Sequence, residues 1–230
     1  MEQEVRIAAL MTAPRHEITY ARNRIELELK QLSIPLSVSL GVFYGQCMQK
    51  MLEQLVDDGQ AEYAVTIDFD SLFTASQLRR LVSWIISRDD IDAIAPLQVR
   101  RSKPVMLGTV HSSVGAETIE TGDKQVVWDG NPIRARTAHF GLTVIDLKKL
   151  AQVPKPWFMS VPDEHGSWGD NKTDDDVYFW LQWEKAGHSV YLAPDVRIGH
   201  LEEMVAIHDP QMQVKHIYPH EWEKQCDSAD

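Results

Sequence analysis

The first hundred residues alternate between short apolar runs and longer segments with apolar residues at helical spacing. This alternation constrains the fold more than any other feature. The short runs predict strands and the longer segments predict helices. Strands that alternate with helices favour parallel strands, right-handed crossovers and helices that cover the sheet. The sequence therefore predicts an α/β fold with a Rossmann-like, mostly parallel sheet. The expected strands span 5–11, 36–42, 63–67 and 91–97, and the expected helices span 20–31, 46–56 and 74–87.

The second half of the chain is less regular. From 100 to 131 it is rich in Gly, Ser and Thr with short alternating runs, a pattern that predicts hairpins or a mobile insertion. Residues 12–15, 154–158 and 193–195 are expected to be a loop, an extended connection and a turn. The other expected elements are strands at 138–145, 189–192 and 196–200, a short helix at 146–151 and a helix at 177–185.

Composition narrows the class of protein. The chain has 230 residues, of which 43% are hydrophobic and 25% charged, which suits one globular domain with at most a small appendage. A net charge of -11 argues against a broad electrostatic footprint on nucleic acid or on an anionic membrane. Cys47 and Cys226 lie far apart, so we expect no disulfide framework and a reducing, cytoplasmic location. No signal-peptide pattern or apolar run of about 18 residues is present, so no membrane insertion is expected.

An acidic pair, Asp68 and Asp70, stands where the expected strand 63–67 ends. In open α/β sheets, ligands bind in the crevice at the carboxyl ends of the strands. Paired hard oxygen ligands there suit Mg²⁺ or Mn²⁺ carrying a diphosphate. The same spacing recurs at 90–92 and 174–176, so the position on a buried strand distinguishes this pair. The first strand has no G-x-G-x-x-G after it, which argues against dinucleotide binding.

A second group of carboxylates precedes the apolar helix expected at 177–185. Thr173 or Asp174 can cap that helix, and acidic residues in a first helical turn often do nothing else. The functional alternative is a general base, because a carboxylate held at a helix N-terminus can take the proton of an attacking hydroxyl. Asp175 and Asp176 cannot both point the same way, so we expect one to act on the acceptor and the other to cap or support it.

Several single residues have a structural and a functional interpretation. His200 follows a glycine at the end of a strand; a lone histidine is more often structural, although imidazole also binds Mn²⁺. Trp157 and Phe158 could stack on sugar rings, but a core role is the better prediction. Trp168 lies in an acidic, glycine-containing loop that could close over a ligand. Buried, structural roles are predicted for His139, Trp180 and Trp183.

Four segments in this order resemble glycosyltransferases of the GT-A type, especially the inverting family 2 type. They are the first strand with 12–15, the acidic pair at 68–70, the glycine-containing strand at 140–142 with its Pro-Trp-Phe segment, and the block 173–200. That block has an acidic pair, a helix, a glycine turn, a strand and a terminal Gly-His. Trp168-Gly169 adds a local resemblance to β-1,4-galactosyltransferases. The resemblance covers roughly 5 to 203 of the printed numbering.

The resemblance implies a GT-A, or nucleotide-diphospho-sugar transferase, fold and a hexosyl- or pentosyltransferase that uses Mn²⁺ or Mg²⁺. The donor would be a nucleotide sugar, by default linked to uridine diphosphate, and transfer to an acceptor hydroxyl would invert the configuration. Asp70 would bind the metal, Asp68 would touch the ribose or a metal-bound water, and His200 would be the third metal ligand. Asp176 matches the base, with Asp175 as second choice. The family usually has Glu-Asp here, and the shorter side chain of Asp175 leaves the assignment of roles between the two open. The residues expected around the donor are Thr12, Ala13, Pro14, Arg15, Asp68, Phe69, Asp70 and Trp168.

The expected domain spans 1–203, with a nucleotide-binding half at 1–100 and an acceptor or catalytic half at 101–203, followed by a tail at 204–230. The tail could pack across the site, mediate oligomerisation or be disordered, and the oligomeric state stays open. The acceptor could be a small molecule, a saccharide, a protein or a hydroxymethylated DNA base. One alternative is a sugar-phosphate nucleotidyltransferase, although 11–15 lacks the glycine expected of a triphosphate loop. Another is a non-catalytic nucleotide-sugar-binding module of the same fold.

Overall fold

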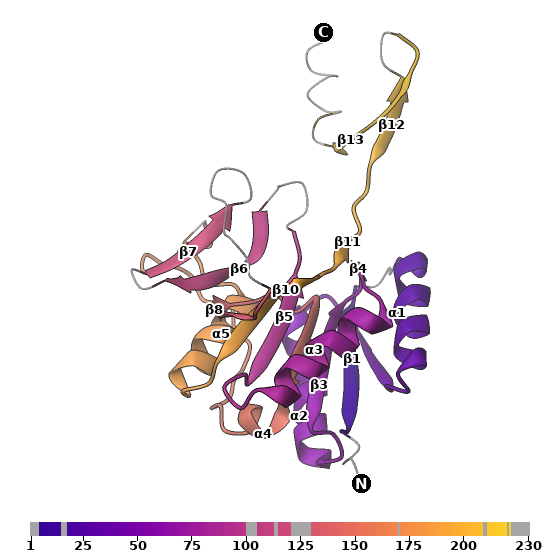
Figure 1. Ribbon diagram of the computed structural model, residues 1–230. Helices are drawn as coiled ribbons and strands as arrows, with labels where there is room; N and C mark the ends of the chain where they lie inside the picture. The colour runs from indigo at the N-terminus through magenta and orange to yellow at the C-terminus, as the bar shows by residue number, and fades with distance from the viewer. Residues whose placement is uncertain are drawn as a thin grey trace.

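The computed structural model describes residues 5–14, 18–99, 105–112, 115–120, 130–169, 171–208, 211–219 and 221 (Figure 1). Within this part of the chain, nine strands form one sheet in the order β2-β1-β3-β9-β5-β10-β8-β6-β7. The bounds are β1 Ile7–Ala13, β2 Leu36–Leu40, β3 Tyr63–Asp68, β5 Ala93–Leu97, β6 Val105–Ser112, β7 Gly115–Glu120, β8 Ile133–Thr137, β9 Leu142–Asp146 and β10 Val190–Arg197.

The centre of the sheet is mostly parallel, as predicted. β1 pairs in parallel with β2 and β3, and β5 pairs in parallel with β10. β9 is inserted antiparallel between β3 and β5, so these two neighbours of β9 run in the same direction. Beyond β10, strands β8, β6 and β7 continue the sheet with antiparallel pairs. The carboxyl ends of β1, β2, β3, β5 and β10 therefore meet at one edge.

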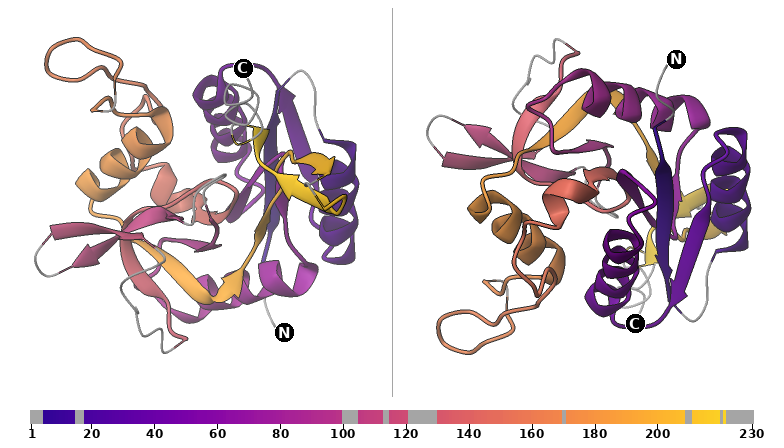
Figure 2. Two further views of the ribbon diagram at one scale, coloured as in Figure 1. Left: turned by 90° about the horizontal axis from the view of Figure 1, so that it is seen from above. Right: turned by 90° about the horizontal axis from the view of Figure 1, so that it is seen from below.

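Helices cover both faces of the sheet (Figure 2). Because successive residues of a strand point to opposite faces, Leu10 and Met11 of β1 enter two different hydrophobic clusters. Leu10 packs in the cluster that holds side chains of α2, α4 and α5, and Met11 in the one that holds side chains of α1 and α3. The helices are α1 Thr19–Gln31, α2 Tyr44–Asp58, α3 Ala75–Ser87, α4 Leu147–Leu150 and α5 Asp175–Lys185.

Several predicted boundaries are wrong. The loop expected at 12–15 begins later, because β1 continues through Ala13, whose carbonyl accepts the Gly41 N–H at 3.0 Å. The turn expected at 193–195 lies inside β10, where the pairing with β5 shifts register between Ala193 and Arg197. The strand expected at 138–145 starts only at Leu142. β8 was not predicted, since its sequence IRART carries two arginines that hide its apolar alternation.

Two smaller sheets complete the structure. β4 (Ser71–Leu72) pairs with β11 (Gly199–His200), which brings the end of the β10 segment back to the end of β3. β12 (Val205–His208) and β13 (Val214–Ile217) form an antiparallel hairpin within the expected tail, and Figure 1 shows it projecting beyond β11. Among the described residues, no helix has the length and apolar character that crossing a bilayer requires.

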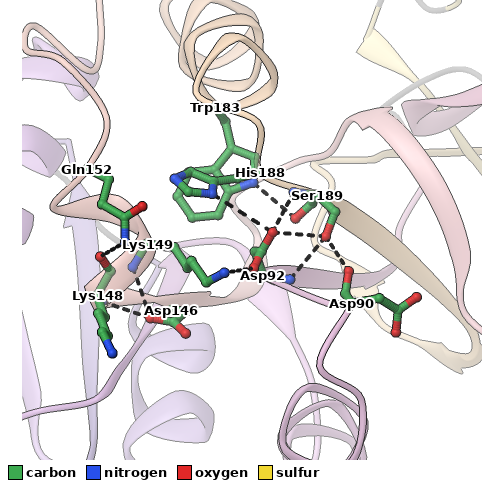
Figure 3. A network of polar contacts seen from close by, with 9 residues as sticks. All are labelled: Asp90, Asp92, Asp146, Lys148, Lys149, Gln152, Trp183, His188 and Ser189. Atoms are coloured by element: carbon green, nitrogen blue, oxygen red, sulfur yellow. Dashed lines mark hydrogen bonds and ion pairs between the residues drawn. The ribbon is translucent and has the colours of Figure 1, made fainter.

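A polar network joins the amino-terminal end of β5 to its neighbours, at the edge opposite the carboxyl ends (Figure 3). The buried Asp92 accepts the Ser189 N–H at 2.8 Å and lies 3.0 Å from the Lys149 ammonium nitrogen. Asp90 receives two hydrogen bonds from Arg88 and one from the Tyr191 hydroxyl. The Arg88 hydrogen bonds lower the pKa of Asp90 to about 2. Both carboxylates are thus engaged by the protein itself.

Candidate active site at the carboxyl edge of the sheet

A cavity of about 620 Å³ lies where β1, β2 and β3 end and where α2 and α5 begin. Its position is the crevice at the carboxyl ends of parallel strands, which is the usual ligand site of such sheets. The wall brings together carboxylates from segments that are far apart in the sequence. The predicted site residues that line it are Thr12, Ala13, Pro14, Asp68, Phe69, Asp70, Asp175 and Asp176.

Three other predicted site residues are not among the described residues that line the cavity. Arg15 lies outside the described residues. Trp168 is 61% exposed and is not part of the cavity wall; it sits in a loop closed by backbone pairing between Val161 and Thr173. His200 is also outside the wall, but it reaches the cavity indirectly through contact with Asp70.

The pairing of β4 with β11 explains how His200 meets Asp70. Leu201 donates its N–H to the Asp70 carbonyl at 2.9 Å, and His200 pairs with Ser71. His200 Nε2 lies 3.3 Å from Asp70 Oδ2, with the two side chains only 8% and 3% exposed. His200 Nδ1 is 3.0 Å from the Val99 carbonyl oxygen. A carbonyl can only accept, so Nδ1 carries the hydrogen and Nε2 faces the carboxylate.

The set predicted for a metal, Asp68, Asp70 and His200, is not gathered into one cluster. Within the described part of the chain, no group of three or more His, Cys, Asp or Glu side chains is arranged to hold a metal ion. Asp70 and His200 do lie together, and a carboxylate with an imidazole suits Mn²⁺. The Nδ1–H bond to a backbone carbonyl is also the usual support of a metal-binding histidine. Two protein ligands fit an ion that shares a substrate diphosphate and keeps several waters.

His139 lines the cavity, and its ring is hydrogen-bonded to the backbone on both sides. His139 Nδ1 accepts the Gly141 N–H at 3.0 Å, and Nε2 donates to the Pro96 carbonyl at 2.9 Å. Burial lowers the pKa of His139 to about 4, so the ring is neutral near pH 7. A Cβ on Gly141 would lie 2.3 Å from Gln98 Oε1, so only glycine allows this close packing. The structural role predicted for His139 is confirmed.

The acidic residues at the start of α5 have three different environments. Asp174 occupies the N-cap position, but its side chain pairs with Lys172 at 2.8 Å and makes no capping bond. Asp175 accepts the Gly45 N–H through Oδ2 at 2.9 Å and the Asp176 N–H through Oδ1 at 3.1 Å. The helix begins two residues earlier than predicted, so both Asp175 and Asp176 lie in its first turn.

Asp176 has the environment expected of a proton acceptor. Burial raises the pKa of its carboxyl, and the negative charges of Asp175 and Asp174 raise it further, against a lowering effect of the Val177 N–H. That amide donates to Asp176 Oδ1 at 2.7 Å. A carboxylate with a raised pKa holds a proton more tightly and is better matched to base catalysis near neutral pH.

Sequence reasoning missed Tyr44, which lines the cavity. Its hydroxyl oxygen is buried and has no hydrogen-bond partner among the described residues. Burial raises the pKa of Tyr44 well above its usual value, and the charges of Asp68, Asp176 and Asp175 add to the rise. The phenol is therefore a neutral donor surrounded by carboxylates. The helix predicted at 46–56 excluded Tyr44, and no local signal marked it.

An aromatic cluster supports this wall from below. The Tyr44 ring makes edge contacts with Phe140 and Phe158, each at 6.1 Å between centroids. Phe140 stacks on Trp180 of α5 at 5.3 Å. The core roles predicted for Trp157, Phe158, Trp180 and Trp183 are confirmed, since all four are buried. The cluster fixes the start of α2 against α5, on which the cavity depends.

Comparison with solved structures finds similar folds. The chain matches A197 from STIV with a TM-score of 0.57 and 11% identity, over 92% of this chain and 94% of that one. It matches GalNAc-T7, solved with UDP, GalNAc and Mn²⁺, with a TM-score of 0.53 and 11% identity, over 88% of this chain and 45% of that one. A match to the inositol-1-phosphate CTP transferase from T. maritima has a TM-score of 0.47 at 12% identity, over 97% of this chain and 96% of that one.

No family model matches the sequence, and no curated protein does. The likenesses at 11% identity concern the fold alone. Together with the sheet order and the cavity at its carboxyl edge, they show that this chain has the GT-A, nucleotide-diphospho-sugar transferase fold.

Proposed function

We propose that the protein is a metal-dependent glycosyltransferase. It would move a hexosyl or pentosyl group from a nucleotide diphosphate sugar, first of all a uridine diphosphate sugar, to an acceptor hydroxyl with inversion. One observation carries this proposal: Asp68 and Asp70 line the same cavity of about 620 Å³ as Asp176. That volume lies in the usual range for small-molecule sites. The cavity therefore combines a diphosphate-binding chemistry with a separate proton acceptor.

On the donor side, Asp70 and His200 would hold Mn²⁺ or Mg²⁺, with Asp68 at the ribose or a metal-bound water. The ion would act as a Lewis acid that stabilises negative charge on the leaving diphosphate. Thr12 and Ala13 at the end of β1, with Pro14 directly after them, would flank the nucleoside. Arg15 would contact the donor phosphate, and Trp168 would belong to a loop that closes over the donor. GalNAc-T7, which shares the fold, was solved with UDP and Mn²⁺, and this supports the choice of donor and metal.

On the acceptor side, Asp176 would accept the hydroxyl proton as the oxygen attacks the anomeric carbon. Its raised pKa supports this role, because the carboxylate keeps affinity for a proton near neutral pH. Inversion requires the base and the leaving group on opposite sides of the sugar. α5 supplies Asp176 and the end of β3 supplies Asp70, so the two come from different walls.

The residues that line the cavity help to compare the glycosyltransferase with the two alternative functions. Of the residues described as lining the cavity, none is Lys or Arg, whereas a nucleotidyltransferase must hold a triphosphate. A non-catalytic binding module would have no use for a carboxylate with raised proton affinity. The division into a donor half at 1–100, an acceptor half at 101–203 and a tail remains part of the proposal. The acceptor class stays open among small molecules, saccharides, proteins and hydroxymethylated DNA bases.

A thermal-shift panel tests the proposal. Nucleoside diphosphates, triphosphates and nucleotide sugars are each added with Mn²⁺ and with EDTA. We expect a rise in Tm with one diphosphate and its sugars in Mn²⁺ alone, since a ligand at 100 times its Kd adds about 2.7 kcal/mol to the free energy of unfolding. Preference for a triphosphate would favour the nucleotidyltransferase. Donor binding with no transfer or hydrolysis would favour the binding module, and no shift at all would contradict a nucleotide site.

A further inference from the structure

We propose that Asp175 is a positioning residue whose carboxylate ties the start of α5 to the start of α2 and thereby holds Asp176 toward the cavity. This inference rests on the proposed function, because it takes Asp176 as the base. It also gives a structural reason for ranking Asp176 above Asp175 as the base. Asp175 then supports the reaction without touching the substrate.

The carboxylate of Asp175 is hydrogen-bonded to the backbones of both helices. Its Oδ2 accepts the N–H of Gly45, 130 positions away in the sequence, and its Oδ1 accepts the N–H of Asp176. Both amides belong to first helical turns, where N–H groups have no partner within the helix. Helix N-termini also carry partial positive charge that favours a carboxylate. Each oxygen of Asp175 thus accepts a backbone N–H, and one of these bonds links α5 to α2.

The packing of Gly45 explains why α2 can approach Asp175 so closely. A Cβ built on this residue would lie 2.5 Å from Asp175 Oδ2 and 2.8 Å from Phe158 Cβ. A side chain on residue 45 would not fit in this space. Its absence lets the α2 backbone lie directly against the carboxylate. The first turn of α2 is therefore shaped to receive Asp175.

The contact has a consequence for the cavity. Asp176 follows Asp175 on α5, and Tyr44 precedes Gly45 on α2, so one carboxylate fixes both walls. Tyr44 and Asp176 both line the cavity, and the negative charge of Asp176 adds to the effect of burial and of Asp68 in raising the pKa of Tyr44. In catalysis, a displacement of about 1 Å of a reacting group can cost on the order of 100-fold in rate. Losing the tie should therefore slow the reaction more than it weakens donor binding.

Two variants distinguish loss of the Asp175–Gly45 contact from loss of the Asp175 charge. Asp175→Ala removes the carboxylate, whereas Gly45→Ala keeps it and inserts a methyl group into the contact. The assay is hydrolysis of UDP-glucose in Mn²⁺, and the Kd of UDP is measured by calorimetry. We expect both variants to lower kcat by about 10- to 100-fold while the Kd of UDP changes less than about 3-fold. Asp175→Asn, which keeps one acceptor oxygen, should recover part of the rate.

Asp146→Ala is the matched control. The Asp146 side chain accepts the N–H groups of Lys148 and Lys149 at the start of α4, so its loss also removes a carboxylate from a helix N-terminus. α4 follows β9, whose direction is opposite to that of β3, so this cap lies away from the cavity. The control should lower Tm and leave kcat unchanged. A fall in kcat that merely follows Tm in all three variants would overturn the positioning role.

Three other outcomes of these assays would rule out a positioning role for Asp175. Full activity in Gly45→Ala with none in Asp175→Ala would mean that Asp175 acts on the substrate directly. Wild-type kcat in both would show that the tie has no catalytic effect, and loss of UDP binding in both would show that it only maintains the pocket. Each of these results overturns the proposal.

A nuclear magnetic resonance measurement keeps this test separate from the test of function. In labelled protein, the Gly45 amide proton should lie downfield in the wild type, as expected for a hydrogen bond to a carboxylate, and should move upfield in Asp175→Ala. The Asp176 carboxyl carbon should titrate at lower pH in Asp175→Ala, because one neighbouring charge is gone. If no donor binds or reacts, the proposed function fails while these resonances still decide whether the tie exists. Unchanged Gly45 and Asp176 resonances would overturn it.

Discussion

Two acidic pairs of the same spacing lie near opposite edges of the sheet, and they differ in what satisfies them. Asp68 and Asp70 come at the carboxyl end of β3, and Asp90 and Asp92 come before the amino end of β5. The second pair is bound by the side chains around it: Arg88 and Tyr191 contact Asp90. Lys149 and Ser189 contact Asp92, as Figure 3 shows. The first pair lines a cavity together with Asp176.

The pKa shifts on the two sides have opposite signs. Hydrogen bonds from Arg88 lower the pKa of Asp90 to about 2, whereas burial and neighbouring charge raise the pKa of Asp176. A carboxylate that its own protein neutralises serves the fold. A carboxylate kept among other acids, beside a cavity, retains affinity for a proton or a cation. Position on the sheet, and not spacing in the sequence, separates the two uses.

The largest expected effect is that of Asp176→Asn. We expect donor affinity to be kept and transfer to fall by about 100- to 10,000-fold, the usual contribution of a general base. In the wild type, the rate should rise with pH through the raised pKa of Asp176, because only the unprotonated form accepts a proton. The measurements are the UDP Kd and the pH profile of turnover. Transfer at the wild-type rate would move the base elsewhere.

Asp70→Ala should act on donor binding. Removing a carboxylate that contacts His200 takes away one of the two adjacent candidate metal ligands, and we expect a loss of about 100-fold in Mn²⁺-dependent affinity for UDP. Calorimetry in Mn²⁺ and in EDTA measures the difference. An unchanged dependence on Mn²⁺ would place the metal away from Asp70.

Asp92→Ala should do the reverse and reduce stability. The Ser189 N–H and hydroxyl would lose a charged acceptor, which costs about 2 kcal/mol in the free energy of unfolding. Urea denaturation measures this loss, and the Kd of UDP should stay at the wild-type value. A large effect on UDP binding would break the distinction between the two edges.

The positions of the residues proposed to bind the donor could largely be predicted from local sequence. Asp68 and Asp70 follow a short apolar strand, and His200 ends another, so simple strand patterns place all three near the carboxyl edge. Trp180 and Trp183 could be assigned to the core from helical spacing. These inferences hold because each depends on a segment of fewer than about ten residues and on the rule that parallel strands share an edge.

The remaining features depend on contacts between distant segments. Gly45 is required by Asp175 and Phe158, which are far from it in the sequence, and Tyr44 enters the cavity only through the same packing. The order of β9 between β3 and β5 is likewise a tertiary property. For the same reason, the sequence predicted a supporting role for one of Asp175 and Asp176 but not the contact of Asp175 with Gly45.

Tyr44→Phe is a smaller test of the cavity. A buried hydroxyl with no partner among the described residues is costly, so its removal should raise the free energy of unfolding by about 1 kcal/mol in the absence of ligand. Thermal and urea denaturation without nucleotide measure this change. A marked loss of stability would mean that the hydroxyl supports the apo fold.

The smallest effect is expected for Asp90→Asn. The folded pKa of Asp90, about 2, lies below the value of about 3.9 for an unfolded chain, so its stabilising effect is present above pH 4 and is lost as pH falls toward 2. The variant should therefore lose less stability than the wild type over that interval. Acid denaturation of the two proteins gives the comparison, and equal slopes would contradict it.

Mn²⁺-induced line broadening tests most directly whether the metal binds at the carboxyl edge, because one experiment reports on residues at both edges of the sheet. Labelled protein is titrated with Mn²⁺ in the presence of UDP while its amide resonances are followed. The account predicts early loss of the signals of 68–72 and 199–201, with those of 90–93 and 188–190 unaffected. Early broadening at 90–93, or none at either edge, would contradict a metal and nucleotide site at the carboxyl edge.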